Sequence, residues 1–328
     1  MRQIGRRTVL TAGSLGTLGM LSLASTNAAS AADAKTVRAG EIAPIAIFWP
    51  GLIAVKNGFY PAEGVQVELN YVGGVTASVQ QLIGGSLDFA YTTCEVALQA
   101  AEKGADISIV GGTAIKYPYS MMSARDVKTA ADLKGKKVIL PPPRQDIAIF
   151  FDRWLRENGV KPEEVDKVYD GATPNRYAAL ASGTVAAAAV SQPFDFRAAA
   201  DGYNKLVDFG IYVKDYAFVV ILARKPWLKE NGDTAKAYLR AVSHSIDWFY
   251  DKANRGTAID ILSAASKQDQ TIVAKTYDYY CNELMPFSRK LEVPKASLQN
   301  VATSLGSLGI LKSPQLAANV LDLSYAPH

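Results

Sequence analysis

The fold is decided by one stretch, Tyr71-Val72-Gly73-Gly74-Val75-Thr76-Ala77-Ser78-Val79-Gln80-Gln81-Leu82-Ile83-Gly84-Gly85-Ser86-Leu87-Asp88-Phe89-Ala90-Tyr91-Thr92-Thr93. It indicates the end of a strand, a glycine-rich turn, a short helix, a Gly-Gly break, a short apolar strand and a second polar turn. Strand-to-helix turns place free backbone N–H groups at the mouth of an α/β sheet, where they bind polar or anionic groups. The stretch indicates either a binding rim or an ordinary α/β scaffold that uses glycine in tight turns.

The chain begins with the pattern of a signal peptide. Residues 1–31 contain Arg6-Arg7, then the apolar run Leu15–Ala24, then an A-x-A cleavage site that ends at Ala31. The apolar run is too short and too rich in Gly and Ser to span a membrane. The paired arginines favour twin-arginine export, although Gly5 replaces a common Ser or Thr. We expect cleavage after Ala31, no lipid anchor because no Cys is near, and a periplasmic mature protein.

Composition excludes several classes of protein. The leader carries three arginines and no acidic residue, so 35 basic and 31 acidic residues become 32 and 31 after its removal. A nucleic-acid partner held by bulk charge is therefore not expected. Roughly 300 residues remain, which is enough for two domains. The two cysteines, Cys94 and Cys281, match no metal or disulfide framework, and the sequence leaves open whether they pair.

Hydrophobic periodicity predicts alternating strands and helices in two consecutive runs. Polar turns and glycines separate the elements, which favours mostly parallel sheets covered on both faces. Two extended apolar segments would carry the chain from one run to the other and back. From Pro226 onward the sequence becomes helical and amphipathic, and these helices would brace the first lobe and the junction. The predicted strands are 36–40, 65–71, 107–111, 138–140, 165–169 and 185–190, the main predicted helices are 94–103 and 147–158, and the crossings are 113–123 and 216–223.

The deciding stretch has an echo later in the chain. Leu82–Ala90 aligns with Leu180–Ala188 without gaps, and both copies indicate a helix end, a Gly break and a short strand. Thr92-Thr93 of the first copy falls on Val190-Ser191 of the second. The repeat favours two similar α/β lobes over one long domain.

Four segments stand out along the chain, in the order Gly58–Val65, Gly85–Ala90, Asp132–Val138 and Leu180–Val185 followed by Pro193. Together they resemble the periplasmic solute-binding proteins of ABC importers, in the SsuA/THI5-like group that includes sulfonate, taurine, nitrate and thiamine-precursor binders. One departure is Ala186, where the second unit usually carries an acid.

The resemblance implies an α/β, two-lobed type II periplasmic binding protein fold with a ligand cleft between the lobes. It also implies a membrane permease as partner for a monomeric protein, with no cofactor and no metal. We expect lobe 1 at 32–118 plus 222–328 and lobe 2 at 119–221.

Candidate ligand contacts lie at the strand-to-helix turns and the crossings. Trp49 either stacks on a ligand or packs in the core beside the following helix. The hydroxyls of the threonine candidates either bind ligand oxygens or cap helices. Aromatic residues beside the cleft favour a solute with an apolar body and a polar or anionic end. The candidates in this set are Trp49, Gly74, Thr76, Thr92, Thr93, Tyr117, Tyr119, Gln192 and Tyr216.

Arg144 is the candidate for an anionic group of the solute. It follows three prolines and precedes a predicted helix N-terminus, so a guanidinium and free amides would lie together. The alternatives are a solvated Arg or an ion pair with Asp146 or Asp152. The same Asp146 is a candidate cap for the helix that follows.

An enzyme of the same fold is the rival hypothesis. The resemblance extends to thiamine-pyrimidine synthases and to a desulfinase with a nucleophilic Cys. Cys94 stands at a predicted helix N-terminus, but His244 and His328 are the only histidines and neither is near it in sequence. We therefore expect a binding protein whose lobes close around the solute, and no catalytic residue. A third class, a purely structural or interaction protein, would show no stabilisation by any ligand.

Overall fold

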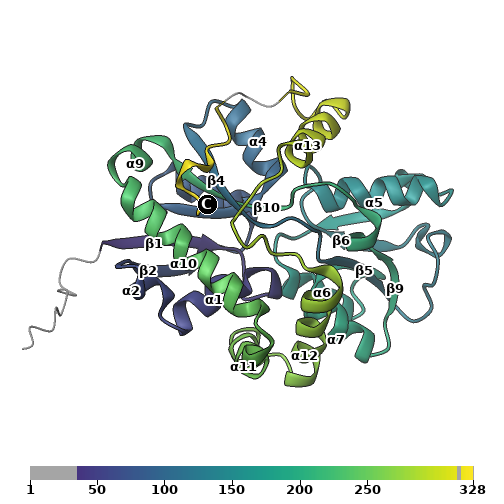
Figure 1. Cartoon of the computed structure of the whole chain (residues 1–328). Helices are drawn as coiled ribbons and strands as arrows, with labels where there is room; N and C mark the ends of the chain where they lie inside the picture. Colours follow the sequence, from purple (N-terminus) through teal and green to yellow (C-terminus); the bar gives the residue numbers. More distant parts are fainter. Residues whose placement is uncertain (1–34, 316–318, 328) are drawn as a thin grey trace, which may run out of the picture. The chain divides into compact units, whose positions relative to one another are not determined.

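The computed structural model describes residues 35–315 and 319–327, so the predicted signal peptide lies outside the described residues (Figure 1). The described strands form two five-stranded sheets. The first sheet has the order β2 (Gln66–Tyr71), β1 (Thr36–Glu41), β3 (Phe89–Thr93), β10 (Val219–Arg224) and β4 (Ile107–Ala114). The second has the order β7 (Asp166–Tyr169), β6 (Lys137–Leu140), β8 (Ala187–Ser191), β5 (Tyr119–Ser123) and β9 (Asn204–Asp208).

The two sheets have the same topology. In each sheet the first three strands of a run pair in parallel, and the fourth position is filled by a strand that arrives from the other sheet. These arriving strands, β10 and β5, pair antiparallel with both of their neighbours. The chain therefore crosses between the sheets after β4 and returns before β10. The predicted two-lobed α/β architecture is confirmed, while the residue limits of the lobes stay a prediction.

The internal repeat lies at the equivalent strands of the two sheets. β3 and β8 are the third strands of their runs, and the glycine before each, Gly85 and Gly183, has a positive φ of 80° and 73°. A side chain is strained at such a φ, which explains why both copies carry glycine there. The backbone N–H groups of Asp88 and Ala186 donate equivalent bonds to the first strands, at Arg38 O and Lys137 O, both 2.8 Å long.

Helices cover both sheets (Figure 1). Helix α10 packs on α1 and α2, α13 packs on α4, and α12 contacts α7 of the second run, so the C-terminal helices contact both lobes. Among the described helices, none combines the length and the apolar character that a membrane crossing requires. Their bounds are α1 (Trp49–Lys56), α2 (Phe59–Ala62), α3 (Val75–Ile83), α4 (Cys94–Glu102), α5 (Asp146–Glu157), α6 (Thr173–Ala181), α7 (Phe194–Ala200), α8 (Phe209–Tyr212), α9 (Lys225–Glu230), α10 (Gly232–Tyr250), α11 (Arg255–Ser266), α12 (Gln270–Tyr279) and α13 (Lys295–Ser307).

Asp88 ties the start of β3 to β1. Its buried carboxylate accepts hydrogen bonds from the backbone N, Nε and Nη2 of Arg38, at 2.9, 3.1 and 2.8 Å. The second lobe has Ala186 at the equivalent place, so this acid is not needed for the topology itself. It holds the deciding stretch in register with β1 through charge-assisted bonds.

We predict that Asp88→Ala lowers the free energy of unfolding by about 1–3 kcal/mol, because it leaves a backbone donor and a guanidinium without their acceptor. Urea denaturation measures this loss. Asp106→Ala is the matched control, since Asp106 is 66% exposed in its side chain and lies 3.9 Å from Lys225. Equal stability of the two variants would show that the Arg38 contacts do not hold the strand.

Candidate functional site

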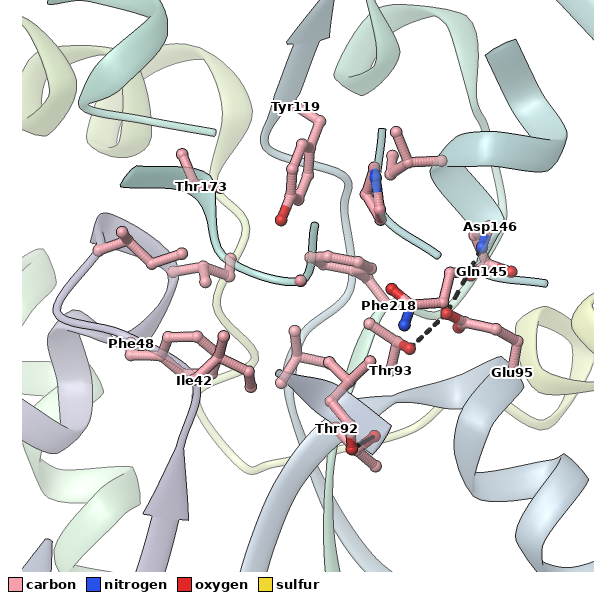
Figure 2. A pocket seen from close by; sticks show the side chains of 17 residues that line it. Ile42, Phe48, Thr92, Thr93, Glu95, Tyr119, Gln145, Asp146, Thr173 and Phe218 are labelled. Carbon is pink, nitrogen blue, oxygen red and sulfur yellow. Dashed lines mark hydrogen bonds between the residues drawn. The ribbon is translucent and has the colours of Figure 1, made fainter. Parts of the chain in front are cut away.

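A cavity of about 30 Å³ lies between the two sheets and is lined by 17 residues from both of them (Figure 2). The first lobe contributes the loop after β1, the end of β3, the start of α4 and the residues at the start of β10. The second lobe contributes the start of β5 and the loops after β6 and β7. The polar and aromatic lining residues are Phe48, Thr92, Thr93, Glu95, Tyr119, Gln145, Asp146, Thr173 and Phe218.

The cavity lies at the carboxyl ends of the parallel strands. Chains that leave β1, β3, β6 and β7 at these ends turn into loops or helices whose first residues face one another. This is the place where open α/β sheets bind ligands, because the strand-to-helix turns carry free polar groups. Most of the lining is apolar, with the polar side chains concentrated at the start of α4 and α5.

Two carboxyl groups from opposite lobes meet at one end of the cavity, as Figure 2 shows. Glu95 lies in the first turn of α4 and Asp146 in the first turn of α5, and their exposures are 0% and 1%. The backbone N of Asp146 donates to Glu95 Oε1 over 3.5 Å, and the Thr93 hydroxyl donates to the same oxygen. Glu95 Oε2 is buried without a partner among the described residues.

Tyrosines from both crossings hold Asp146 in place. The Tyr117 hydroxyl donates to Asp146 Oδ2, and the Tyr216 hydroxyl donates to Oδ1 over 3.4 Å. The two rings lie 5.7 Å apart, centroid to centroid. The chain therefore brings its outgoing and returning crossings to one carboxyl group in the second lobe.

Burial changes the protonation of this pair. Desolvation raises the pKa of Glu95, and desolvation together with the Glu95 charge raises the pKa of Asp146 well above its ordinary range. Two adjacent buried carboxyls cannot both ionise at low cost. Burial therefore favours a proton on at least one of the two acids.

The cavity wall has no basic side chain among the 17 lining residues. Arg176 of α6 is a fully buried cation, and it donates to the carbonyls of Ala189 and Asp170, both over 2.6 Å. Its Nη2 donates to Thr173 Oγ1 over 2.9 Å and to the Tyr119 hydroxyl over 3.4 Å. Arg176 thus lies behind two hydroxyl groups of the wall and orients them.

Three of the predicted ligand contacts, Thr92, Thr93 and Tyr119, line the cavity. Gly74 lies beside it at a close approach of the lobes, where a Cβ on Gly171 would lie 3.0 Å from Gly73 O and 3.4 Å from Gly74 Cα. Tyr117 and Tyr216 lie behind the wall as partners of Asp146. These residues come together as the two-lobe hypothesis expects, but only some of them face the cavity.

The remaining predicted contacts lie elsewhere. Thr76 and Arg144 line a separate groove of about 650 Å³ between α3, α4 and the proline loop, where Arg144 Nη2 donates to Ile310 O over 3.3 Å. The carbonyl of Gln192 accepts from Ala46 N of the other lobe over 3.2 Å, and its side chain donates to Asp195. Asp152 pairs with Lys167, not with Arg144.

Trp49 packs in the core. It is fully buried, its Nε1 donates to the Ala258 carbonyl over 2.8 Å, and its ring lies 5.0 Å from that of Phe249 and 5.9 Å from that of Tyr277. Of the two alternatives for Trp49, packing in the core matches the structure, because the C-terminal helices cover the indole ring.

Glu95 was not among the predicted ligand contacts. Asp146 was predicted as a helix cap or as an ion-pair partner of Arg144. Glu95 is two residues past Thr93, so the polar turn could have been extended to include it. Asp146 was a candidate cap, but the structure makes it the first residue of α5, with Gln145 as the N-cap and no side-chain cap bond. Its carboxyl group faces the other lobe. A helix N-terminus stabilises a carboxylate both at the N-cap and at the first helical residue.

Comparison with known proteins identifies the family. The family model described as NMT1/THI5 like matches residues 47–255, which is more than half of the chain. The chain belongs to the NMT1/THI5-like family. YtlA of Bacillus subtilis, provisionally named a binding protein, is 20% identical over 250 residues, with 74% of this chain and 75% of YtlA covered.

Solved structures share the fold of this NMT1/THI5-like protein. The alkanesulfonate-binding protein SsuA from Xanthomonas axonopodis pv. citri, bound to MOPS, has a TM-score of 0.73 at 17% identity, with 88% of this chain and 98% of that one covered. The periplasmic nitrate-binding protein NrtA from Synechocystis has a TM-score of 0.70 at 18% identity, with coverages of 85% and 83%. The fold is thus the two-lobed fold of periplasmic binding proteins.

We predict that Trp49→Phe lowers the free energy of unfolding by about 1–3 kcal/mol and leaves ligand affinity unchanged, because it removes a buried donor from the Ala258 carbonyl. Urea denaturation and ligand titration measure the two effects. Trp248→Phe is the control, since Trp248 is half-buried. A loss of ligand affinity with unchanged stability would contradict the core role and would show that Trp49 contacts the ligand.

Proposed function

We propose that the protein captures a small solute in the cavity between its lobes and delivers it to the permease of an ABC importer. The observation that carries this proposal is a cavity at the carboxyl ends of strands from both lobes, with buried polar groups from each. Such a site is complete only when the lobes are together, so binding and closure are coupled. The solute-binding names of SsuA and NrtA support the same function.

The size of the cavity supports a mechanism of opening and closing. A volume of about 30 Å³ holds no more than a few waters, so an organic solute enters only when the lobes separate. We propose that separation occurs at the crossing segments between β4 and β5 and between α8 and β10. Tyr117 and Tyr216 lie on these segments and both bind Asp146, which links the position of the crossings to the site.

We propose that the mature protein is a periplasmic monomer. It would be exported by the twin-arginine route, and the predicted leader, residues 1–31, would be cleaved off. The prediction of an anionic or polar solute used Arg144 and the aromatic residues beside the cleft. Arg144 lies in the groove beside α3 and α4 and is not part of the cavity wall.

An enzymatic role has little support from Cys94. Burial and the neighbouring carboxyls raise the pKa of the Cys94 thiol well above its ordinary range, which disfavours the thiolate that a nucleophile requires. Cys94 and Cys281 are both free thiols in the structure. Binding without turnover is the simpler use of this site.

We predict that a thermal-shift screen of amines, amidines, pyrimidines, sulfonates, aromatic acids and nitrate finds a compound that raises the melting temperature saturably. A solute at 100 times its Kd stabilises the folded state by about 2.7 kcal/mol. Mass spectrometry of the mixture checks that the compound is unchanged. Turnover of the compound would favour the enzyme, and no stabilisation by any compound would contradict solute capture.

We predict that Gly171→Ala weakens solute affinity by about tenfold, because the new Cβ would lie 3.0 Å from Gly73 O and keep the lobes apart. Gly74→Ala is the matched control, since a Cβ there would lie 3.9 Å from Gly171 Cα. Titration measures affinity, and small-angle scattering with saturating solute measures closure. Equal affinities of the two variants would show that this approach of the lobes is not part of binding.

A further inference from the structure

We propose that the solute carries a protonated nitrogen, an ammonium or amidinium group, which Glu95 and Asp146 bind from opposite lobes. This inference rests on the proposed function and names the solute class of the same cavity. It differs from the prediction, made from the sequence, of a solute with a polar or anionic end.

Glu95 and Asp146 present two carboxyl groups at one end of the cavity, and both are almost fully buried. Asp146 accepts from Tyr117 and Tyr216, and Glu95 Oε1 accepts from Thr93 and from Asp146 N. Glu95 Oε2 has no donor among the described residues. A buried acceptor of this kind is costly unless a donor comes from outside the chain.

An anionic group placed beside two buried carboxyls meets repulsion that water does not screen. No Lys, Arg or His stands among the 17 lining residues to offset it. Arg176 cannot fill that role at this end, because it lies behind Thr173 and Tyr119 and donates to the protein's own acceptors. A cationic nitrogen, in contrast, is attracted to both carboxyls.

Aromatic side chains form part of the cavity wall. Phe48, Tyr119 and Phe218 line the cavity, and in Figure 2 Phe218 is drawn nearer to the carboxyl pair than Tyr119 or Phe48. Aromatic faces attract cations and also cover the apolar body of a planar ligand. A flat amidinium or an aryl-ammonium compound would therefore match both the carboxyl pair and the aromatic part of the wall.

The cation would replace the proton that burial favours on the pair. Closure without solute buries two carboxyls and favours a proton on one of them, whereas a bound ammonium or amidinium would let both ionise. The ionisable groups that face the pair are Tyr117, Tyr216 and Cys94, and burial raises the pKa of each, so none of them supplies a charge near neutrality. Binding then releases one proton, and affinity rises by up to tenfold per pH unit while the pair stays protonated in the free protein.

The test uses three probes of similar shape, benzamidine, benzoate and benzenesulfonate, in thermal-shift and calorimetric titrations of the mature protein. We expect benzamidine to raise the melting temperature saturably and the two anions to have no effect at equal concentration. Glu95→Gln should weaken benzamidine binding at least tenfold, while Glu102→Gln, an exposed residue of the same helix, should not change it.

A second measurement keeps the test valid if Glu95→Gln does not fold. Benzamidine affinity of the wild type should rise with pH near neutrality, with proton release seen as a dependence of the binding enthalpy on the buffer. Absence of benzamidine binding, a pH-independent affinity or stronger binding of benzoate or benzenesulfonate would each overturn the proposal. In those cases a compound from the wider screen that still stabilises the protein would leave the capture function standing.

Discussion

The candidate site is built around one contact, between two buried acidic residues from different lobes. Glu95 reaches the cavity from the start of α4, and Asp146 reaches it from the start of α5. Hydroxyls from both crossings, at Tyr117 and Tyr216, hold the second of these acids. Because both acids are buried and burial raises the pKa of each, a charged group placed between the lobes would change their protonation. The proposed closure and the proposed recognition of the solute would both act on this pair.

The fold was predictable because its signals are local. The Gly85 and Gly183 breaks, the short apolar strands after them and the alternation of periodicities occur within about ten residues each. The repeat of these signals then predicts two lobes of one topology, and the strand orders confirm it. The antiparallel direction of β5 and β10 follows from the crossings, which the extended segments around Tyr119 and Val219 also indicated.

The candidate site was predictable only in part, because contacts between the two lobes determine which side chains face the cavity. Thr92 and Thr93 end a strand and must lie at its carboxyl edge, so sequence reasoning finds them. Which way Asp146 or Arg144 points depends on the opposite lobe, and Trp49 is covered by helices some two hundred residues later. No local pattern carries that information. The prediction of an anionic or polar solute was made without these two acids for the same reason, and it stays a prediction.

The most direct test of the shared proton is the infrared difference spectrum between the wild type and the double variant Glu95→Gln, Asp146→Asn. The spectrum is recorded near neutral pH. Asp195, whose pKa burial raises to about 6, and Glu41, whose pKa burial also raises, are present in both proteins and cancel. One carboxylic-acid carbonyl band and one carboxylate band are expected from the wild type alone. Two carboxylate bands with no acid band would contradict it.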